Sequence, residues 1–202
     1  MKLLAAALIV ASVASQGTAQ SIITAAPNNG SGGVFLQLTP ASTSLQVTSF
    51  ASYFSSAAGT PVNVEVWIRP GAYAGFTASN VGWTLSEVAV GTSAGAAVLS
   101  SNVILTNPIA IPFGGPTSIY LHATTAGGGI RYNGTAALPP VTTYSNADVT
   151  LFSDTSRTGA VAFAGTQFVP RTFSGVINYV PAPGTMALLG VSGLFAARRR
   201  RR

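Results

Sequence analysis

Few residues in this sequence could do acid–base or nucleophilic chemistry. His122 is the single histidine, and the alternation of residues 117–124 turns Ile119, Leu121 and Ala123 to one face and His122 to the other. A Ser–His–Asp arrangement needs the base beside a positioned nucleophile and an orienting acid. No serine is expected in a Gly-x-Ser-x-Gly elbow between a strand and a helix. We therefore expect His122 to be a solvated residue on an outer strand face, with no catalytic role.

The carboxylates are equally sparse. Glycoside hydrolysis needs two carboxyl groups facing each other across the sugar bond. Glu65 and Glu87 are the only glutamates, Glu65 falls on the outer face of its predicted strand, and no sequence feature brings Glu87 opposite it. No catalytic residue is therefore predicted and the chain is expected not to be an enzyme, with a secreted hydrolase kept as an alternative.

The two aspartates raise the question of a metal site. Asp148 and Asp154, with Asn146 and Ser153 nearby, could offer hard oxygen ligands to calcium. The spacing is not that of an EF-hand loop, and Asn and Asp commonly form turns by bonding to their own backbone. We expect no metal and no cofactor, with calcium at Asp148 and Asp154 as the alternative.

Aromatic residues provide a further binding hypothesis. Trp67 and Tyr73 could present flat faces on which sugar rings stack, because alternation turns Trp67 outward. Aromatic residues on an outer sheet face also serve as stabilising cross-strand pairs. A carbohydrate-binding module with Trp67 and Tyr73 in its site is therefore an alternative function.

The elements that would position these side chains are β-strands. Residues 62–69 alternate strictly, and Pro70-Gly71 ends that predicted strand. Its inward face is expected to carry Val62, Val64, Val66 and Ile68. Residues 45–54 form another predicted strand, joined to 62–69 by a hairpin loop at 55–60. Further strands are expected at 34–38, 82–90, 117–124, 147–153, 161–165 and 172–179, and shorter ones at 21–25, 97–105, 109–111 and 130–132.

No stretch between the chain ends has a helical period, and glycine or proline separates most of the predicted strands. Short strands at this spacing are typical of an all-β fold, here a single antiparallel β-sandwich of jelly-roll or immunoglobulin-like type over residues 20–179. Cysteine is absent, which excludes disulfides and thiolate metal sites.

The charge of the chain is concentrated at its ends. The formal net charge is +6, but Lys2 and the arginines at 198–202 supply most of the basic residues. Between residues 20 and 180, four arginines balance four acids. This neutral body has no excess of basic residues that could bind phosphate groups, so nucleic-acid binding is excluded.

The N-terminal residues have the layout of a secretory signal peptide. A positive Met1-Lys2 is followed by an apolar stretch at 3–13 and by the small residues Gly17-Thr18-Ala19. We expect a signal-peptide helix over residues 1–19, use of the export translocon, and cleavage between Ala19 and Gln20.

The C-terminal residues 180–202 have a distinctive layout too, and we call them and residues 1–19 the address segments of the chain. Pro181 and Pro183, followed by Gly184, precede an apolar run at 185–197, and the chain ends in Arg198, Arg199, Arg200, Arg201 and Arg202. Moving arginine side chains into the hydrocarbon core of a membrane costs free energy, so they hold such a chain end on the cytoplasmic side. The run predicts a short transmembrane helix, below the roughly 20 residues of a comfortable span, which suits transient anchoring.

This order of a proline pair, an apolar run and an arginine cluster resembles the PEP-CTERM sorting signal, with Ala182 standing where that family has Glu. The resemblance implies processing by an exosortase-like membrane protease, with Pro181, Pro183 and Gly184 recognised and the arginines setting orientation. It implies an exported, non-catalytic protein of the bacterial cell envelope or extracellular space. Extracellular polysaccharide or biofilm matrix is the expected setting.

A second resemblance covers most of residues 34–179. The order of the segments 64–71, 75–76, 82–85, 144–150 and 170–177 is similar to an extracellular β-domain of bacterial secreted proteins that carry C-terminal sorting signals. It implies a fold and a location, and no chemistry.

Overall fold

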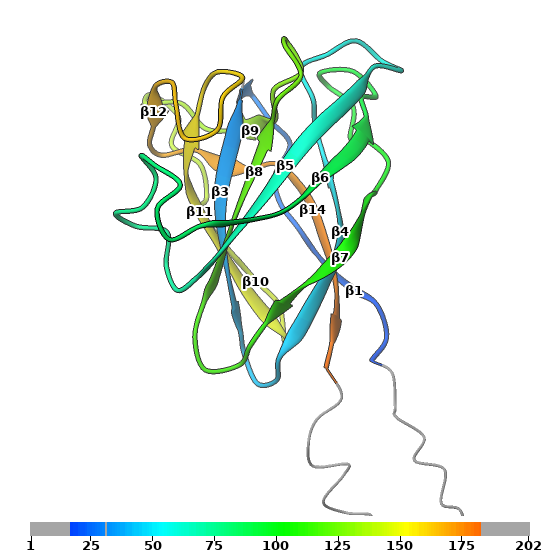
Figure 1. The fold of residues 1–202 in the computed structure, drawn as a ribbon, viewed down its shortest axis with the longest axis vertical. Helices are drawn as coiled ribbons and strands as arrows, with labels where there is room; N and C mark the ends of the chain where they lie inside the picture. The colour runs from blue at the N-terminus through cyan, green and yellow to red at the C-terminus, as the bar shows by residue number, and fades with distance from the viewer. Residues whose placement is uncertain (1–16, 31, 183–202) are drawn as a thin grey trace, which may run out of the picture.

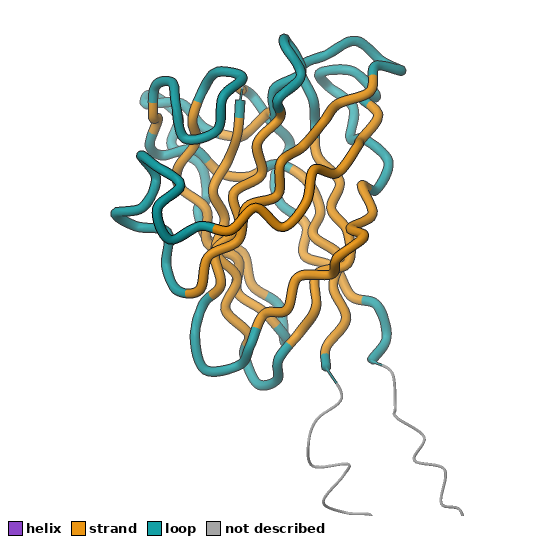
Figure 2. Tube along the Cα trace, in the orientation of Figure 1, coloured by secondary structure: helices purple, strands orange, loops and turns teal. Residues whose placement is uncertain are grey.

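The computed structural model describes residues 17–30 and 32–182 and consists there of β-strands and loops, with no helix (Figure 2). The expected all-β, antiparallel fold is confirmed. The expected signal-peptide helix and the expected helix at 185–197 fall almost entirely outside the described residues. In chain order the strands are β1 (Gln20–Ile23), β2 (Asn29–Gly30), β3 (Gly33–Pro40), β4 (Leu45–Ser52), β5 (Pro61–Pro70), β6 (Thr84–Thr92), β7 (Val103–Ile111), β8 (Thr117–Ala123), β9 (Arg131–Asn133), β10 (Thr143–Ser145), β11 (Val149–Arg157), β12 (Gln167–Phe168), β13 (Thr172–Phe173) and β14 (Gly175–Pro181).

The strands pair into three antiparallel sheets (Figure 1). A four-stranded sheet has the order β1-β14-β4-β7, and a larger sheet has the order β10-β11-β3-β8-β5-β6, with β12 beside β11. A small third sheet has the order β13-β9-β2. We call the second of these the large sheet.

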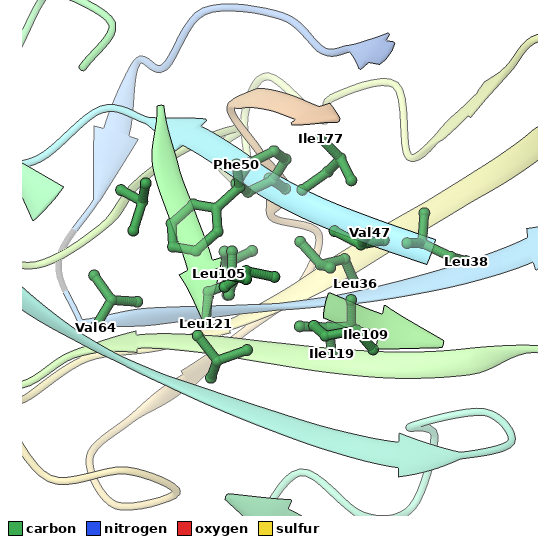
Figure 3. Close-up of a cluster of buried hydrophobic side chains, with 14 of the residues drawn as sticks. Leu36, Leu38, Val47, Phe50, Val64, Leu105, Ile109, Ile119, Leu121 and Ile177 are labelled. Carbon is green, nitrogen blue, oxygen red and sulfur yellow. The ribbon is translucent and has the colours of Figure 1, made fainter. Parts of the chain in front are cut away.

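One hydrophobic core joins the four-stranded sheet to the large sheet. Val62, Val64 and Val66 of β5 are 0% exposed, as their alternation predicts, and Ile68 packs at the edge of the same core. Figure 3 shows side chains from both sheets meeting, among them Leu36, Val64 and Leu121 from the large sheet and Val47, Phe50 and Ile177 from the other. Burial of apolar area at about 25 cal/mol per Å² is the main stabilising contribution of such a core.

The first and last described strands are neighbours. β1 pairs with β14 in a register that puts Gln20 opposite Tyr179 and Ile23 opposite Val176. Beyond the last paired residue, Thr24 N–H donates to the Gly175 carbonyl at 3.0 Å. The chain therefore enters and leaves the described body at the same end (Figure 1).

The expected hairpin between residues 45–54 and 62–69 is wrong. β4 pairs with β14 and β7, whereas β5 pairs with β6 and β8, so the two strands belong to different sheets. Both strands carry buried apolar side chains that face the same core from opposite sides. The connection at 53–60 therefore crosses from one sheet to the other instead of turning back within one.

The expected strand at 161–165 is also wrong, because these residues form a loop between β11 and β12. Phe163 in this loop has φ of 62°, in the left-handed region that a bulky residue rarely adopts. The expected strands at 97–105 and 109–111 are one strand, β7, which begins only at Val103. β2, β10 and β12, each of two or three residues, were not expected.

A candidate binding depression on the large sheet

The face of the large sheet that points away from the main core carries Trp67 and His122, which were expected to point outward. Phe35 of β3, Trp67 of β5 and Tyr120 and His122 of β8 lie on it. Two loops cover this face: the β5–β6 connection contributes Tyr73 and Trp83, and the β11–β12 connection contributes Phe163. Alternation therefore predicts the correct face, but that face is a second apolar cluster and not a solvated surface.

The rings of this second cluster contact one another closely. Phe35 stacks on Tyr120 with centroids 3.9 Å apart, and Phe163 lies 4.8 Å from Tyr120. Tyr73 is only 3% exposed, and its hydroxyl donates to Asp154 Oδ1 at 2.8 Å. Burial and the negative charge of Asp154 raise the pKa of Tyr73. The prediction that Tyr73 presents a free face for sugar stacking is therefore wrong.

His122 is buried, with 0% of its surface exposed, which corrects the expected solvated position. Its Nε2 lies 3.1 Å from the Gly159 carbonyl oxygen. Because a carbonyl only accepts, Nε2 carries a hydrogen, and the neutral ring then has a bare lone pair on Nδ1. That Nδ1 faces Glu65 Oε2 at 3.4 Å.

The environment of His122 favours the neutral ring. Burial lowers the pKa of His122, and the Gly159 carbonyl and the Glu65 carboxylate oppose that shift only in part. A neutral His122 cannot donate to Glu65 from Nδ1, so the carboxylate takes its hydrogen bonds from elsewhere.

Trp67 supplies one of those hydrogen bonds. Its Nε1–H donates to Glu65 Oε2 at 3.0 Å, and both side chains are half-buried. The strand register explains this grouping, because β5 and β8 pair with Glu65 opposite His122 and Trp67 opposite Tyr120. Cross-strand neighbours on one face have Cβ atoms about 5 Å apart.

Glu65 and Trp67 form one side of an open depression of about 520 Å³. The other lining residues come from the two covering loops and are Ala78, Ser79, Asn80, Val161, Ala162, Phe163 and Ala164. We call this the Glu65 depression. Sequence reasoning missed its loop residues and the Glu65–His122 contact, because no residue pattern shows which loop folds over which strand.

The other carboxylates lie elsewhere. Glu87 accepts backbone N–H groups from Thr106 and Asn107 at 3.1–3.3 Å. Asp148 and Asp154 are separated by most of β11, roughly 20 Å of extended chain. Asp148 accepts from Tyr179 and Asp154 from Tyr73, so the structure does not bring the two proposed calcium ligands together. Within residues 17–30 and 32–182, no three His, Asp or Glu side chains cluster as metal ligands would.

One sequence match to a nucleophile elbow occurs at Gly91-Thr92-Ser93-Ala94-Gly95. It ends strand β6 and leads into a loop, not into a helix. Ser93 is 1% exposed, donates to the Ser56 carbonyl at 2.8 Å and accepts from Gly95 N–H at 3.1 Å. Its hydroxyl is therefore used in holding the β6 turn.

The address residues lie at the edges of the described chain. Ala19 directly precedes β1, Gln20 begins it, and Pro181 is the last residue of β14, opposite Leu45. Pro183, Gly184 and Arg198–Arg202 lie outside the described residues. In the part of the chain that the structure describes, no helix has the length and apolar character of a membrane span.

No protein-family model matches this chain, and no curated protein matches it significantly.

Proposed function

We propose that this chain is an exported, non-catalytic bacterial protein of the cell envelope or extracellular space. It uses the export translocon, is anchored transiently in the inner membrane by its C-terminal segment, and is sorted by an exosortase-like protease. It is associated with extracellular polysaccharide or biofilm matrix. The address segments at the two chain ends and the neutral body between them support this proposal.

One structural observation carries it furthest. Because β1 and β14 are paired, residues 17–19 and 180–182 emerge at the same end of the body (Figure 1). A cut at Ala19–Gln20 lies outside β1, and a cut after Ala182 lies outside β14. Residues 1–19 and the residues after Ala182 can therefore be removed without breaking a strand, and a tail held in the membrane leaves the opposite end of the body free.

We further propose that the body is a jelly-roll sandwich rather than an immunoglobulin-like one. Eight strands, taken in chain order as β1, β3, β4, β5, β6, β7, β8 and β14, are arranged first-eighth-third-sixth in one sheet and second-seventh-fourth-fifth in the other. This strand order matches that of a jelly roll and supports the proposal, with β2 inserted after the first of the eight strands and β9–β13 before the last. Jelly rolls occur in lectins among many other proteins, so the topology by itself suggests no single activity.

Fractionation combined with intact mass tests the export proposal. The full chain, produced in a bacterium that has an exosortase, should begin at Gln20, lack its terminal arginines, and occur in the envelope or the medium. Pro183→Ala should retain the tail in the inner membrane, whereas Pro112→Ala, in an exposed loop before β8, should be processed normally. Recovery of the chain from the cytosol with both ends intact would refute the proposal.

A further inference from the structure

We propose that the Glu65 depression binds an uncharged saccharide, whose hydroxyl groups donate hydrogen bonds to the Glu65 carboxylate beside the Trp67 ring. The choice of ligand rests on the proposed extracellular setting, whereas the geometry of the site does not depend on it. The site differs from a pairing of Trp67 with Tyr73, because Tyr73 is buried beneath its loop.

Glu65 has hydrogen-bond acceptor positions that the described residues leave unused. Its side chain is 22% exposed and lines the depression. Oε2 accepts from Trp67, and among the described residues no hydrogen bond reaches Oε1. A carboxylate has about four acceptor positions, so Glu65 is open to donors from a ligand.

The charge of the depression is negative. Nδ1 of His122 lies 3.4 Å from Glu65 Oε2 but has no hydrogen-bond partner in the described part of the chain, so it supplies no donor to the carboxylate. Glu65 is also the only charged residue that lines the depression there. A negative charge at the site disfavours anionic ligands, and the free acceptor positions of Glu65 favour ligands rich in O–H or N–H groups.

The shape of the depression suits a sugar ring. A volume of about 520 Å³ falls in the range of roughly 300–1,000 Å³ typical of ligand sites, but the depression is open and not an enclosed cage. Cages of several aromatic rings recognise quaternary ammonium groups. Here Phe163 is 6% exposed, so Trp67, which is half-buried, is the one lining ring among the described residues that is not fully buried. A single indole at an open site suits the apolar face of a sugar ring better than a small cation.

The described lining of the depression has room and polar groups for a sugar ring but a single carboxylate. Asn80 and Ser79 are exposed at the rim and add an amide and a hydroxyl for further hydrogen bonds, while Ala78, Ala162 and Ala164 leave room for the ring. Hydrolysis needs a second carboxylate. Among the described residues that line the depression Glu65 has no such partner, so the site binds the sugar without cleaving it.

The two tryptophans of the chain make a direct test possible. In ¹⁵N-labelled full-length protein, the indole N–H of Trp67 reports on the depression. That of Trp83, which is 7% exposed and bonded to the Phe76 carbonyl, serves as an internal control. The probes are cellobiose, maltotriose, diacetylchitobiose and galactobiose, with choline as the cationic comparison. We expect at least one sugar to shift the Trp67 signal with saturation, while Trp83 and the choline titration show no change.

Three variants locate the binding. Glu65→Gln should weaken it roughly tenfold or more, because a hydrogen bond to a charged acceptor is lost. Ser79→Arg, at an exposed rim position, should abolish it by filling the depression without touching the core. Glu87→Gln removes a carboxylate outside the depression and should bind as the unchanged protein does.

The proposal is overturned if none of the four sugars moves the Trp67 signal, if only choline does, or if Glu65→Gln and Ser79→Arg both bind normally. These results concern purified protein and are separate from its processing and location. Failure of the binding test therefore leaves the export proposal standing, and failure of the export test leaves the binding site standing.

Discussion

Phe35 and Tyr120 stack face to face, 3.9 Å between centroids and 6° from parallel, on the side of the large sheet that points away from the main core. Both side chains are 0% exposed. The β5–β6 and β11–β12 loops pack Tyr73, Trp83 and Phe163 around this pair. The body therefore has two apolar clusters, one on each face of the large sheet, and the second one holds the loops that form the Glu65 depression.

If the second cluster is a true core, removing Phe35 should be as costly as removing a residue of the main core. Phe35→Ala should lower the free energy of unfolding by about 3–5 kcal/mol, the usual cost of deleting a buried phenylalanine ring. Phe113→Ala, at a position 58% exposed, should change it by less than about 0.5 kcal/mol. Urea unfolding measures both, and equal small effects would show that the loops do not bury this face in solution.

His122 should make stability depend on pH. Burial lowers its pKa in the folded chain, so the unfolded chain binds a proton first as the pH falls below about 6.5. The free energy of unfolding should therefore be constant above pH 6.5 and decrease below it, by at most about 1.4 kcal/mol per pH unit. The groups near the ring are the Glu65 carboxylate, the Tyr120 ring and the Gly159 carbonyl.

The chain has one histidine, so His122→Gln removes this titration entirely. Its stability should be flat between pH 7.5 and 5.5, where aspartate and glutamate contribute little. The opposite slope in the unchanged protein, with stability rising on acidification, would mean that a protonated His122 pairs with Glu65. In that case the neutral ring assigned above is wrong.

Gly33 should not tolerate a side chain. It lies opposite His122 in the β3–β8 pairing, and a β-carbon there would lie 2.7 Å from both the Leu121 carbonyl oxygen and the Tyr120 ring. The ring can shift, but the backbone carbonyl cannot without breaking the sheet. Gly33→Ala should therefore lose about 1–3 kcal/mol of stability, as overpacked positions do.

Gly115→Ala is the matched control, because its β-carbon would meet nothing within 4 Å and its φ is not positive. It should be neutral or gain about 0.4–1 kcal/mol through reduced freedom of the unfolded chain. Thermal unfolding of the two variants compares them directly. Equal melting temperatures would indicate that β3 and β8 are less closely packed than the structure has them.

Local alternation made part of this fold predictable. Residues 62–68 place Val62, Val64 and Val66 inward because a strand repeats every two residues, and the structure buries all three. The same rule assigns His122 to the face opposite Leu121. The alternation does not show whether a loop covers that face. Such covering depends on contacts between residues about 40 positions apart, such as His122 and Gly159.

Pairing of strands could not be predicted in the same way. Residues 45–52 and 61–70 are adjacent in the chain and both apolar on one side, which fits a hairpin and a crossover equally well. The Glu65 depression depends on such long-range choices, since Glu65 meets His122 only through the β5–β8 register. Residues 161–165 read as a strand from their composition, yet Phe163 turns inward from a loop.

Arg69 should control the loop that carries Ala78, Ser79 and Asn80. Its guanidinium carbon lies 3.4 Å from the centre of the Phe76 ring, and Nη1 donates to the carbonyls of Pro70 and Ala72 at 2.8 and 3.1 Å. Lysine keeps the charge but cannot stack a planar group on the ring while donating to both carbonyls. Arg69→Lys should therefore loosen the loop by about 1 kcal/mol, the size of a cation–π contact near the surface.

Hydrogen exchange detects this loosening at two amides of the loop, Phe76 N–H bonded to the Tyr73 carbonyl and Trp83 N–H bonded to the Asn80 carbonyl. Both should exchange roughly fivefold faster in Arg69→Lys and at the normal rate in Arg131→Lys, which changes an arginine of the separate β13-β9-β2 sheet. Saccharide affinity at the Glu65 depression should decrease with the same variant, because a looser loop must be ordered when the ligand binds. Unchanged exchange in Arg69→Lys would mean that Tyr73 and Trp83 alone hold the loop in place.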